Sequence, residues 1–463
     1  MADLSTINLS NWDAYSIAHL VPDRVVRRDG LDALIPALAD EEITVVIGPR
    51  QSGKTTLLGM LVHHLIQKGT DVRSIHFANM DDVGLHAYLE DPDRVIRFIR
   101  DWRGDDRERA YLFLDEIQRL EEAGLLLKRL YDRSRNLKII ASGSSVIDLR
   151  SKVQESLTGR KFEYILYPFS FREFVRAKGR LPDSLLAADD VSWEELRSIQ
   201  ADYGKTLESL WGEFVRFGGY PKVALAEETA RKVRMLSELY TSYVQRDIMG
   251  FVRNGNSRPF LQFMELMAAE VGTVLNKHSL SRTLGRNIRT VDRYIDLTGH
   301  TFVIHLWPPF VGNKRVEIRS APKLAFVDSG LRNYITGDVE LDRPWMRQGG
   351  LIESLVSSEV RKYAGGATLY HWRTRAGAEV DVVIKRGKQI IPVEVKSALR
   401  GRTPLTKGYG SFIEAYRPEM GMYLTMNQLD RRRIGRTMVY WYPIPLFLLF
   451  LPSILPQHRL SNF

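Results

Sequence analysis

Cysteine is absent from this chain of 463 residues, which excludes disulfide bonds and zinc sites built from thiolates. Residues 1–13 lack the basic segment and the apolar run of a secretory signal. The apolar stretch 438–451 is too short to span a bilayer comfortably, and Pro443 and Pro445 interrupt it, so we expect a buried final strand and helix there. The lack of a signal and of a membrane-spanning segment predicts a cytoplasmic protein with no membrane partner, whereas the lack of cysteine alone does not indicate a compartment.

The composition is that of a globular protein, with 44% apolar and 26% charged residues, and the length predicts two to four domains. The net charge is +10, because 66 lysines and arginines outnumber 56 acidic residues. A basic excess fits a polyanion such as DNA, although many basic proteins bind no nucleic acid. A basic cluster near the end is either a phosphate-backbone contact or a solvated turn. It comprises Arg431, Arg432, Arg433 and Arg436.

The chain is organised around residues 42–58, which read EITVVIGPRQSGKTTLL. The apolar run 43–47 predicts a strand, and G-x-x-x-x-G-K-T follows it directly. Its glycines let backbone N–H groups and a helix N-terminus face a phosphate. We expect a loop that binds ATP with Mg²⁺, in which Lys54 reaches the β- and γ-phosphates and Thr55 holds the metal. The expected nucleotide contacts are Gly48, Pro49, Arg50, Gln51, Ser52, Gly53, Lys54, Thr55 and Thr56.

A second apolar strand, 111–114, ends in two carboxylates. Its continuous apolar run is typical of a parallel strand that is buried on both faces. In this interpretation Asp115 binds Mg²⁺ through water, and Glu116 polarises the attacking water. The alternative is a buried strand that ends in two solvated acids.

A third apolar strand, 137–141, ends in Ser142-Gly143-Ser144-Ser145. This placement matches a sensor strand, whose polar tip monitors the γ-phosphate. Ser142 or Ser144 is the candidate for that role. An ordinary Gly/Ser turn is the alternative.

Residues 259–307 predict three helices followed by a strand. Asn287 caps the third helix. At helical spacing, the third helix carries Val291, Tyr294 and Ile295 on its inward face. Arg286, Arg289 and Arg293 then point outward. This is the layout of a helix-turn-helix with a wing, whose strands we expect at 302–310 and 315–321. The alternative is a domain-packing module with a solvated basic face.

Residues 379–396 predict a hairpin with a tight turn at 386–388. Strand periodicity puts Glu394 and Lys396 on one face, and the preceding strand supplies Asp381. This D…E-x-K arrangement is that of restriction-type nucleases. Asp381 and Glu394 would bind a divalent metal, Lys396 would steady the attacking water or the phosphate, and Glu353 would complete the site. The same fold can also persist as a binding module without cleavage.

These segments together resemble the AAA-family ATPases of the archaeal and bacterial type that carry a C-terminal DUF4143 domain. The resemblance rests on GPRQSGKTTLL, LFLDEIQ, ASGSS, SLTGR, LYPFSFREF, FGGYP, YVQRDI, FVDSGL and the EVD…EVK set. It extends from Arg24 to the end of the chain. It implies an ATPase core, a helical lid, a winged-helix segment and a nuclease-like fold.

The same resemblance draws attention to Arg160. In such ATPases an arginine after the sensor strand stabilises the transition state across a subunit boundary, which implies a homo-oligomer. Arg246 is a second candidate for this role. A surface arginine, or a partner in a structural ion pair, is the alternative for Arg160.

We therefore predict an α/β multidomain protein. The expected domains are a P-loop NTPase (AAA+) core over 1–178, a helical lid over 179–250, a winged helix-turn-helix over 251–322 and a PD-(D/E)xK nuclease-like α/β domain over 323–463. The expected function is ATP hydrolysis coupled to DNA, with branched or broken DNA as the candidate substrates. The alternatives are an ATP-regulated, metal-dependent endonuclease and a nucleotide-controlled assembly switch without DNA chemistry.

Overall fold

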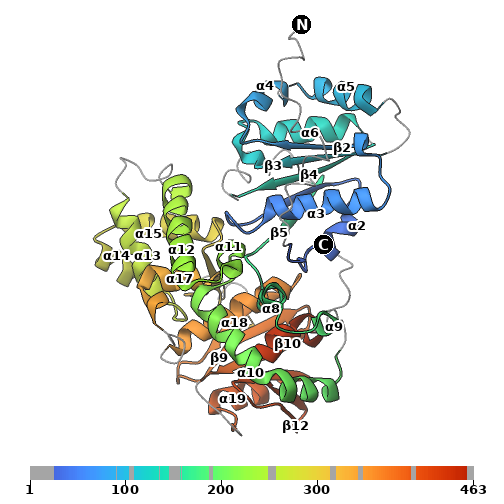
Figure 1. The fold of residues 1–463 in the computed structure, drawn as a ribbon. Helices are drawn as coiled ribbons and strands as arrows, with labels where there is room; N and C mark the ends of the chain where they lie inside the picture. Colours follow the sequence, from blue (N-terminus) through green and yellow to red (C-terminus); the bar gives the residue numbers. More distant parts are fainter. Residues whose placement is uncertain are drawn as a thin grey trace. The chain divides into compact units, whose positions relative to one another are not determined.

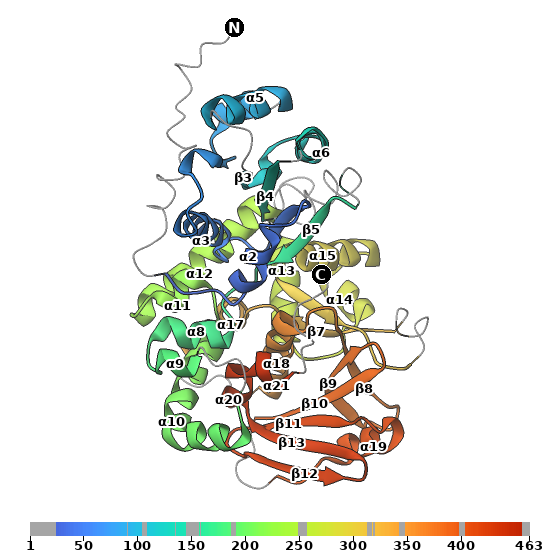
Figure 2. The same ribbon diagram turned by 90° about the vertical axis from the view of Figure 1, so that its right-hand side faces the viewer.

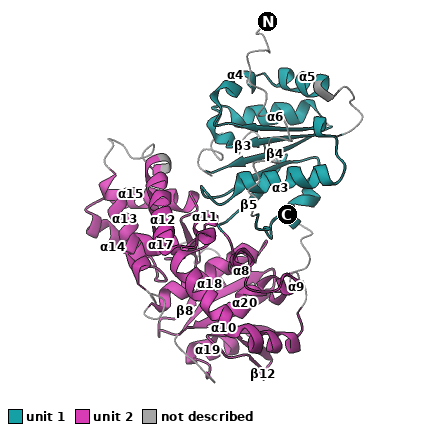
Figure 3. Ribbon diagram, viewed as in Figure 1, with its two compact units in different colours: residues 1–168 teal, residues 169–463 magenta. Residues whose placement is uncertain are grey.

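The computed structural model, drawn from two directions in Figures 1 and 2, describes most of the chain. The described residues are 25–89, 91–103, 109–134, 136–144, 157, 159–186, 191–248, 257–312, 317, 320–341, 348–397 and 403–455. The chain divides into two compact units, residues 1–168 (unit 1) and residues 169–463 (unit 2) (Figure 3). No helix among the described residues is long and apolar enough to cross a membrane.

Unit 1 is built on five parallel strands in the order β2-β3-β4-β1-β5. The strands are β1 (Ile43–Ile47), β2 (Ile75–Asn79), β3 (Ala110–Asp115), β4 (Leu137–Gly143) and β5 (Lys161–Ile165). The apolar runs of the sequence predict β1, β3 and β4, and the structure confirms them. β1 and β4 are buried along their whole length, as central parallel strands are.

Helices cover both faces of this sheet. The helix α3 (Lys54–Gln67) lies on one face, and α6 (Ala123–Arg133) lies on the other (Figures 1 and 2). The remaining helices of unit 1 are α2 (Leu31–Ala37), α4 (His86–Leu89) and α5 (Pro92–Arg103). Leu57, Leu58 and Leu61 of α3 pack against Val46 and Phe113 of the sheet in one apolar core. This packing fixes where α3 begins.

Unit 2 starts with a series of helices. They are α8 (Phe171–Lys178), α9 (Asp183–Leu186), α10 (Trp193–Phe217), α11 (Pro221–Leu225) and α12 (Thr229–Tyr243), and a π-helical turn (Val244–Ile248) follows. Both α8 and α10 begin with a capping box, in which a serine and a glutamate three residues later satisfy each other's backbone N–H groups.

The three helices predicted between residues 259 and 307 are present. They are α13 (Arg258–Ala269), α14 (Lys277–Leu284) and α15 (Ile288–His300). The Asn287 side chain caps α15 by accepting a hydrogen bond from the Thr290 N–H at 2.8 Å. The predicted inward residues Val291, Tyr294 and Ile295 are buried, and Arg286, Arg289 and Arg293 are exposed.

The strand pair that follows differs from the predicted wing. β6 (Ile304–Trp307) lies within the expected 302–310 segment, and it pairs with β7 (Lys323–Phe326), which follows the expected second wing strand. Residues 315, 316, 318 and 319 of the expected segment lie outside the described residues. β7 begins at Lys323, directly after Pro322. Proline has no N–H to donate to a strand ladder and is tolerated just before a strand, so it explains this start.

The rest of unit 2 is a six-stranded mixed sheet in the order β12-β13-β11-β10-β9-β8. Its strands are β8 (Thr368–Arg373), β9 (Glu379–Arg386), β10 (Gln389–Lys396), β11 (Met420–Thr425), β12 (Asp430–Ile434) and β13 (Thr437–Pro443). The predicted β9–β10 hairpin is confirmed, and its turn contains Gly387 at φ 57°. Of the basic cluster near the end, Arg431, Arg432 and Arg433 lie on the edge strand β12, and Arg436 lies in the turn between β12 and β13.

Helices accompany this sheet as α17 (Ser329–Thr336), α18 (Gly349–Tyr363), α19 (Lys407–Tyr416), α20 (Ile444–Leu449) and α21 (Leu451–Ile454). The predicted final strand and helix are β13 and α20, and α20 is wholly buried. The helix α20, near the end of the chain, packs against α8 and α10, the first long helices of unit 2. Trp193 of α10 also contacts Tyr442 of β13, with ring centroids 5.7 Å apart.

Two glycine-containing segments of the sequence, FGGYP and FVDSGL, contact each other within unit 2. The buried Asp328 carboxylate accepts hydrogen bonds from the Gly219 N–H at 2.7 Å and from the Leu331 N–H at 3.0 Å. A Cβ atom on Gly219 would lie 2.1 Å from the Phe169 carbonyl oxygen, so only glycine fits this approach. The FGGYP and FVDSGL segments therefore have an interlocking structural role.

Candidate nucleotide site and a second charged cluster

The loop between β1 and α3 has the backbone shape that a phosphate cradle requires. Gln51 and Gly53 have positive φ angles of 59° and 96°, and α3 starts directly after them at Lys54. A Cβ atom on Gly48 would lie 2.2 Å from the Leu166 carbonyl oxygen. The Ser52 hydroxyl is buried and has no hydrogen-bond partner among the described residues. These features fit a bound phosphate, which would take donors from the loop and from the start of the helix.

Arg28 is hydrogen-bonded to this loop, and the sequence analysis does not predict this contact. Its guanidinium donates from Nη1 to the Ser52 carbonyl and from Nη2 to the Tyr167 carbonyl, each at 2.7 Å. The residue is buried at 5% exposure. It lies in the basic segment RVVRR at residues 24–28, and such a segment is typical of an exposed surface.

The two residues that open α3 differ in their surroundings. Lys54 is buried, and its Nζ donates to the carbonyls of Gly48 at 3.2 Å and Pro49 at 3.0 Å. The exposed Thr55 donates from Oγ1 to Asp115 Oδ2 at 2.6 Å. The predicted metal-binding hydroxyl and carboxylate therefore lie together. Arg50 and Thr56 flank them in the same loop and helix, half-buried.

Asp115 ends β3 and is fully buried. The Ser142 hydroxyl donates to its Oδ1, and the Thr55 hydroxyl donates to its other oxygen. Burial raises the pKa of Asp115, and these two hydrogen bonds oppose that shift. Ser142 of the predicted sensor strand thus contacts the predicted Mg²⁺ carboxylate directly.

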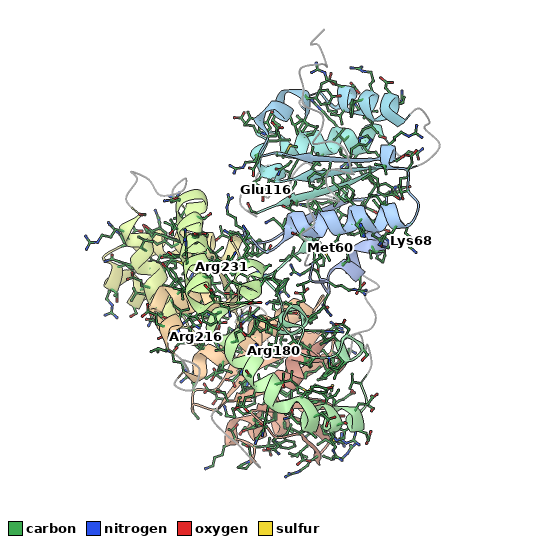
Figure 4. All side chains as sticks on the ribbon, in the orientation of Figure 1. Met60, Lys68, Glu116, Arg180, Arg216 and Arg231 are labelled. Atoms are coloured by element: carbon green, nitrogen blue, oxygen red, sulfur yellow. The ribbon has the colours of Figure 1, made fainter. Side chains whose placement is uncertain are left out.

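Glu116 follows in a left-handed conformation at φ 54°, unusual for a residue other than glycine. Gln118 donates from Nε2 to Glu116 Oε2 and, at 2.9 Å, to the Ser144 hydroxyl. The Ser144 hydroxyl also lies 3.3 Å from Glu116 Oε2. Figure 4 shows Glu116 at the edge of unit 1 opposite Lys68, the residue that directly follows α3. Gln118 is a second positioning residue that the sequence did not reveal.

The arginine candidates are placed differently. Arg160 forms an ion pair with Asp132, in which Arg160 Nε lies 2.9 Å from Asp132 Oδ1. The two side chains are 35% and 42% exposed. This is the ion-pair role that the sequence left open. The backbone of Arg246 lies in the π-helical turn, and its side chain lies outside the described residues.

A second cluster gathers the predicted D…E-x-K residues in unit 2. Asp381 of β9 and Glu394 of β10 are buried at 3% and 1% exposure. Lys396 Nζ lies 2.8 Å from Glu394 Oε1 and 3.9 Å from Asp381 Oδ2. The Thr406 hydroxyl donates to Glu394 Oε1 at 3.0 Å. The structure therefore brings Asp381, Glu394 and Lys396 together as the sequence predicts.

Glu353 of α18 joins this cluster through a lysine that the sequence did not reveal. Lys323 Nζ lies 2.7 Å from Glu353 Oε2 and 3.4 Å from Asp381 Oδ1. Burial, followed by the nearby Asp381 carboxylate, raises the pKa of Glu353 to about 7, and the same causes raise that of Glu394 to about 7. Burial lowers the pKa of Lys323, but Asp381 and Glu353 outweigh it, so the pKa is raised.

The cluster does not have the shape of a metal site. Within the described residues, no group of three or more histidine, cysteine, aspartate or glutamate side chains is arranged to hold a metal ion. The divalent metal expected from the D…E-x-K pattern therefore does not fit the residues as they stand.

Family comparisons follow the same division of the chain. The model described as an AAA domain matches residues 40–175, and the model of the DUF4143 domain matches residues 348–447. The chain therefore carries an AAA domain and a C-terminal DUF4143 domain, as the resemblance in the sequence predicts. A third model, DUF8612, a domain of unknown function, matches residues 208–342.

The similar proteins are themselves uncharacterised. One from Haemophilus influenzae is 23% identical over 413 residues and covers 88% of this chain and 96% of its own length. One from Methanocaldococcus jannaschii is 24% identical over 361 residues, covering 75% of this chain and 72% of its own length.

Among solved structures, a Walker-type ATPase of Pyrococcus abyssi aligns with a TM-score of 0.41 and 12% identity, over 69% of this chain and 99% of that one. The RuvB Holliday junction branch migration motor of Thermotoga maritima aligns with a TM-score of 0.29 and 16% identity, over 62% of this chain and 92% of that one. The assignment of the AAA domain therefore rests on the family model and on the loop geometry.

Proposed function

We propose that the AAA domain binds ATP with Mg²⁺, hydrolyses it and couples hydrolysis to DNA. The observation that carries the chemistry is the contact between Thr55 and Asp115 at the start of α3, with Lys54 and Glu116 on either side. The experiment that tests the whole proposal is the ATPase rate of the full chain without DNA and with linear, forked and four-way DNAs.

Each residue of the nucleotide site has a role in this proposal. The loop Gly48–Thr56 cradles the phosphates, and Lys54 neutralises their charge. Thr55 and Asp115 would hold Mg²⁺, directly and through water, and Ser142 orients Asp115. When bound, Mg²⁺ supplies charge neutralisation on the phosphate oxygens. Glu116 orients and deprotonates the attacking water, and Gln118 and Ser144 hold its carboxylate.

The remaining segments complete the proposal. The helices of 179–250 would form a lid, and residues 251–322 would form a DNA-binding winged helix that presents α15. The observation behind DNA binding is the exposed row of Arg286, Arg289 and Arg293, in a chain of net charge +10. Such side chains bind phosphates without reading sequence.

Replacing Arg289 and Arg293 with alanine should weaken DNA binding and flatten its salt dependence. Two lost phosphate contacts would lower the slope of log K against log salt by about 1.8. The measurement is affinity for a labelled duplex by fluorescence anisotropy at several salt concentrations. The matched control replaces Arg431 and Arg433 of β12, which changes the net charge equally. A slope that falls only in the control would move the contact to β12.

The proposed homo-oligomer can be tested through Arg160. If this arginine acts across a subunit boundary, mixing Arg160→Ala chains with Lys54→Ala chains should restore part of the ATP turnover, because mixed interfaces combine one intact site with one intact arginine. Phosphate release at several mixing ratios is the measurement, with co-assembly verified by light scattering. No recovery at any ratio would leave Arg160 its structural ion pair with Asp132.

The endonuclease alternative requires a divalent metal at Asp381 and Glu394. Lys396 is the lysine that the D…E-x-K pattern itself supplies, but Lys323 lies between Asp381 and Glu353, and this contact argues against a metal there. The assembly-switch alternative would show ATP-dependent association without any salt-dependent DNA binding, which the same titrations would reveal.

A further inference from the structure

The charged cluster of unit 2 contains its own cations. Lys323 lies between Glu353 and Asp381, and Lys396 lies between Asp381 and Glu394. Three carboxylates and two ammonium groups leave a net charge of −1 when all are ionised. A buried group of carboxylates without cations would be strongly unfavourable, so these lysines stabilise it in the way that a bound metal otherwise does.

The lysines and their neighbours contact both carboxylate oxygens of Asp381 and one oxygen each of Glu353 and Glu394. Asp381 Oδ1 contacts Lys323, and Asp381 Oδ2 accepts a hydrogen bond from the Val395 N–H at 2.9 Å. Glu394 Oε1 contacts Lys396 and Thr406, whereas Glu394 Oε2 is buried without a partner among the described residues. A divalent cation bridging Glu353 and Asp381 would have to displace the Lys323 ammonium, since both would occupy the space between the same oxygens.

Lys323 is held at this position by its backbone. It begins β7, where it pairs with Trp307 of β6, and it forms a second bridge with Val274 on its other side. The β6–β7 pair is in turn hydrogen-bonded to α18. Phe326 N–H donates to the Ser354 hydroxyl at 3.0 Å, and Trp307 Nε1 donates to the Ser357 hydroxyl at 3.1 Å. The lysine is thus a fixed part of the cluster.

Lys323 also comes from a different part of the chain than the carboxylates. It lies in the segment that matches DUF8612, whereas Glu353, Asp381 and Glu394 lie in the segment that matches DUF4143. The DUF4143 segment alone therefore has the carboxylates of a metal site. The DUF8612 segment supplies Lys323, whose ammonium group lies where the metal would bind.

We propose that Lys323 is the resident cation of this cluster, that it takes the place of a divalent metal between Glu353 and Asp381, and that removing it creates a metal site. Lys323 joins the two family segments through this contact. The cluster in the native chain is then a structural element. This proposal does not depend on ATP hydrolysis, so a chain that fails to hydrolyse ATP would not contradict it.

The test is Mn²⁺ binding by the full chain without nucleotide, measured by calorimetry and by the electron paramagnetic resonance signal of bound Mn²⁺. Lys323→Met removes the charge and keeps most of the side-chain volume. It should bind Mn²⁺ at least about tenfold more tightly than the wild type, because a like charge has been removed from contact with the ligand oxygens. Adding Asp381→Asn to Lys323→Met should abolish that gain.

The controls separate this result from simple charge effects. Lys388→Met removes an exposed lysine from the β9–β10 turn and should leave Mn²⁺ binding unchanged. Wild type and Asp381→Asn should bind Mn²⁺ equally, which tests the proposal even if Lys323→Met does not fold. Wild-type Mn²⁺ binding that Asp381→Asn removes, or a Lys323→Met variant that folds and gains no affinity, would overturn the proposal.

Discussion

Lys54→Ala should reduce ATP turnover by about 10²–10³-fold or more, the range for removing a donor that stabilises transition-state charge. Lys54 is the one residue of the G-K-T triplet whose charged group is held over the loop, with Nζ on the carbonyls of Gly48 and Pro49. Alanine has no group that could follow the phosphate charge during transfer. Phosphate release under saturating ATP measures the effect, and binding of a fluorescent ATP analogue separates lost affinity from lost catalysis.

A matched control lies at the other end of the same helix. Lys68 follows α3 and is exposed, so Lys68→Ala makes the same charge change away from the loop and should leave turnover unchanged. Thermal unfolding of both variants shows whether the loss of a buried lysine affects the fold. A folded Lys54→Ala chain with wild-type turnover would remove the loop from the mechanism.

Glu116→Gln should slow hydrolysis by about 10²-fold or more and leave ATP binding intact, because the change removes the proton acceptor and keeps the size of the side chain. The carboxylate is held by Gln118 and Ser144 at the end of β3, next to Asp115 in the chain. Single-turnover hydrolysis together with nucleotide affinity distinguishes the two effects. Glu121→Gln, at an exposed position five residues on, is the control.

A Glu116→Gln chain that hydrolyses ATP at the wild-type rate would contradict the assignment and leave Glu116 a solvated acid at a strand end. Loss of ATP binding in the same variant would instead give Glu116 a part in holding the nucleotide.

The sequence predicts the parts of this protein that depend on local pattern. Ile43–Ile47 and Ala110–Asp115 are strands because their apolar runs suit a strand buried on both faces, and the residues that follow them carry the site. The hairpin at Gly387 follows from alternation and a tight turn, which also brings Asp381 beside Glu394. In each case the information lies within about twenty residues of chain.

What the sequence does not predict depends on distant partners. Arg28 is buried because it finds the carbonyls of Ser52 and Tyr167, and nothing near Arg28 in the sequence announces them. Lys323 looks like an exposed strand-start lysine until α18 and β9 place Glu353 and Asp381 around it. β5 (Lys161–Ile165) is an edge strand with charged residues, so it carries no apolar run. Buried charge is the recurring difficulty, since its sequence signature is that of the surface.

The packing of α20 against α8 and α10 has a consequence for how the protein is made. Residues 1–168 can complete their sheet and helices as soon as they leave the ribosome, since all five strands lie within them. Unit 2 cannot, because its first helices need Ile444–Leu449 to cover their apolar faces. At ordinary rates of synthesis, these apolar faces remain uncovered for on the order of tens of seconds, until α20 has been made. During that interval the nascent chain presents a folded ATPase unit followed by uncovered helices, which makes α8 and α10 the expected binding sites for a chaperone.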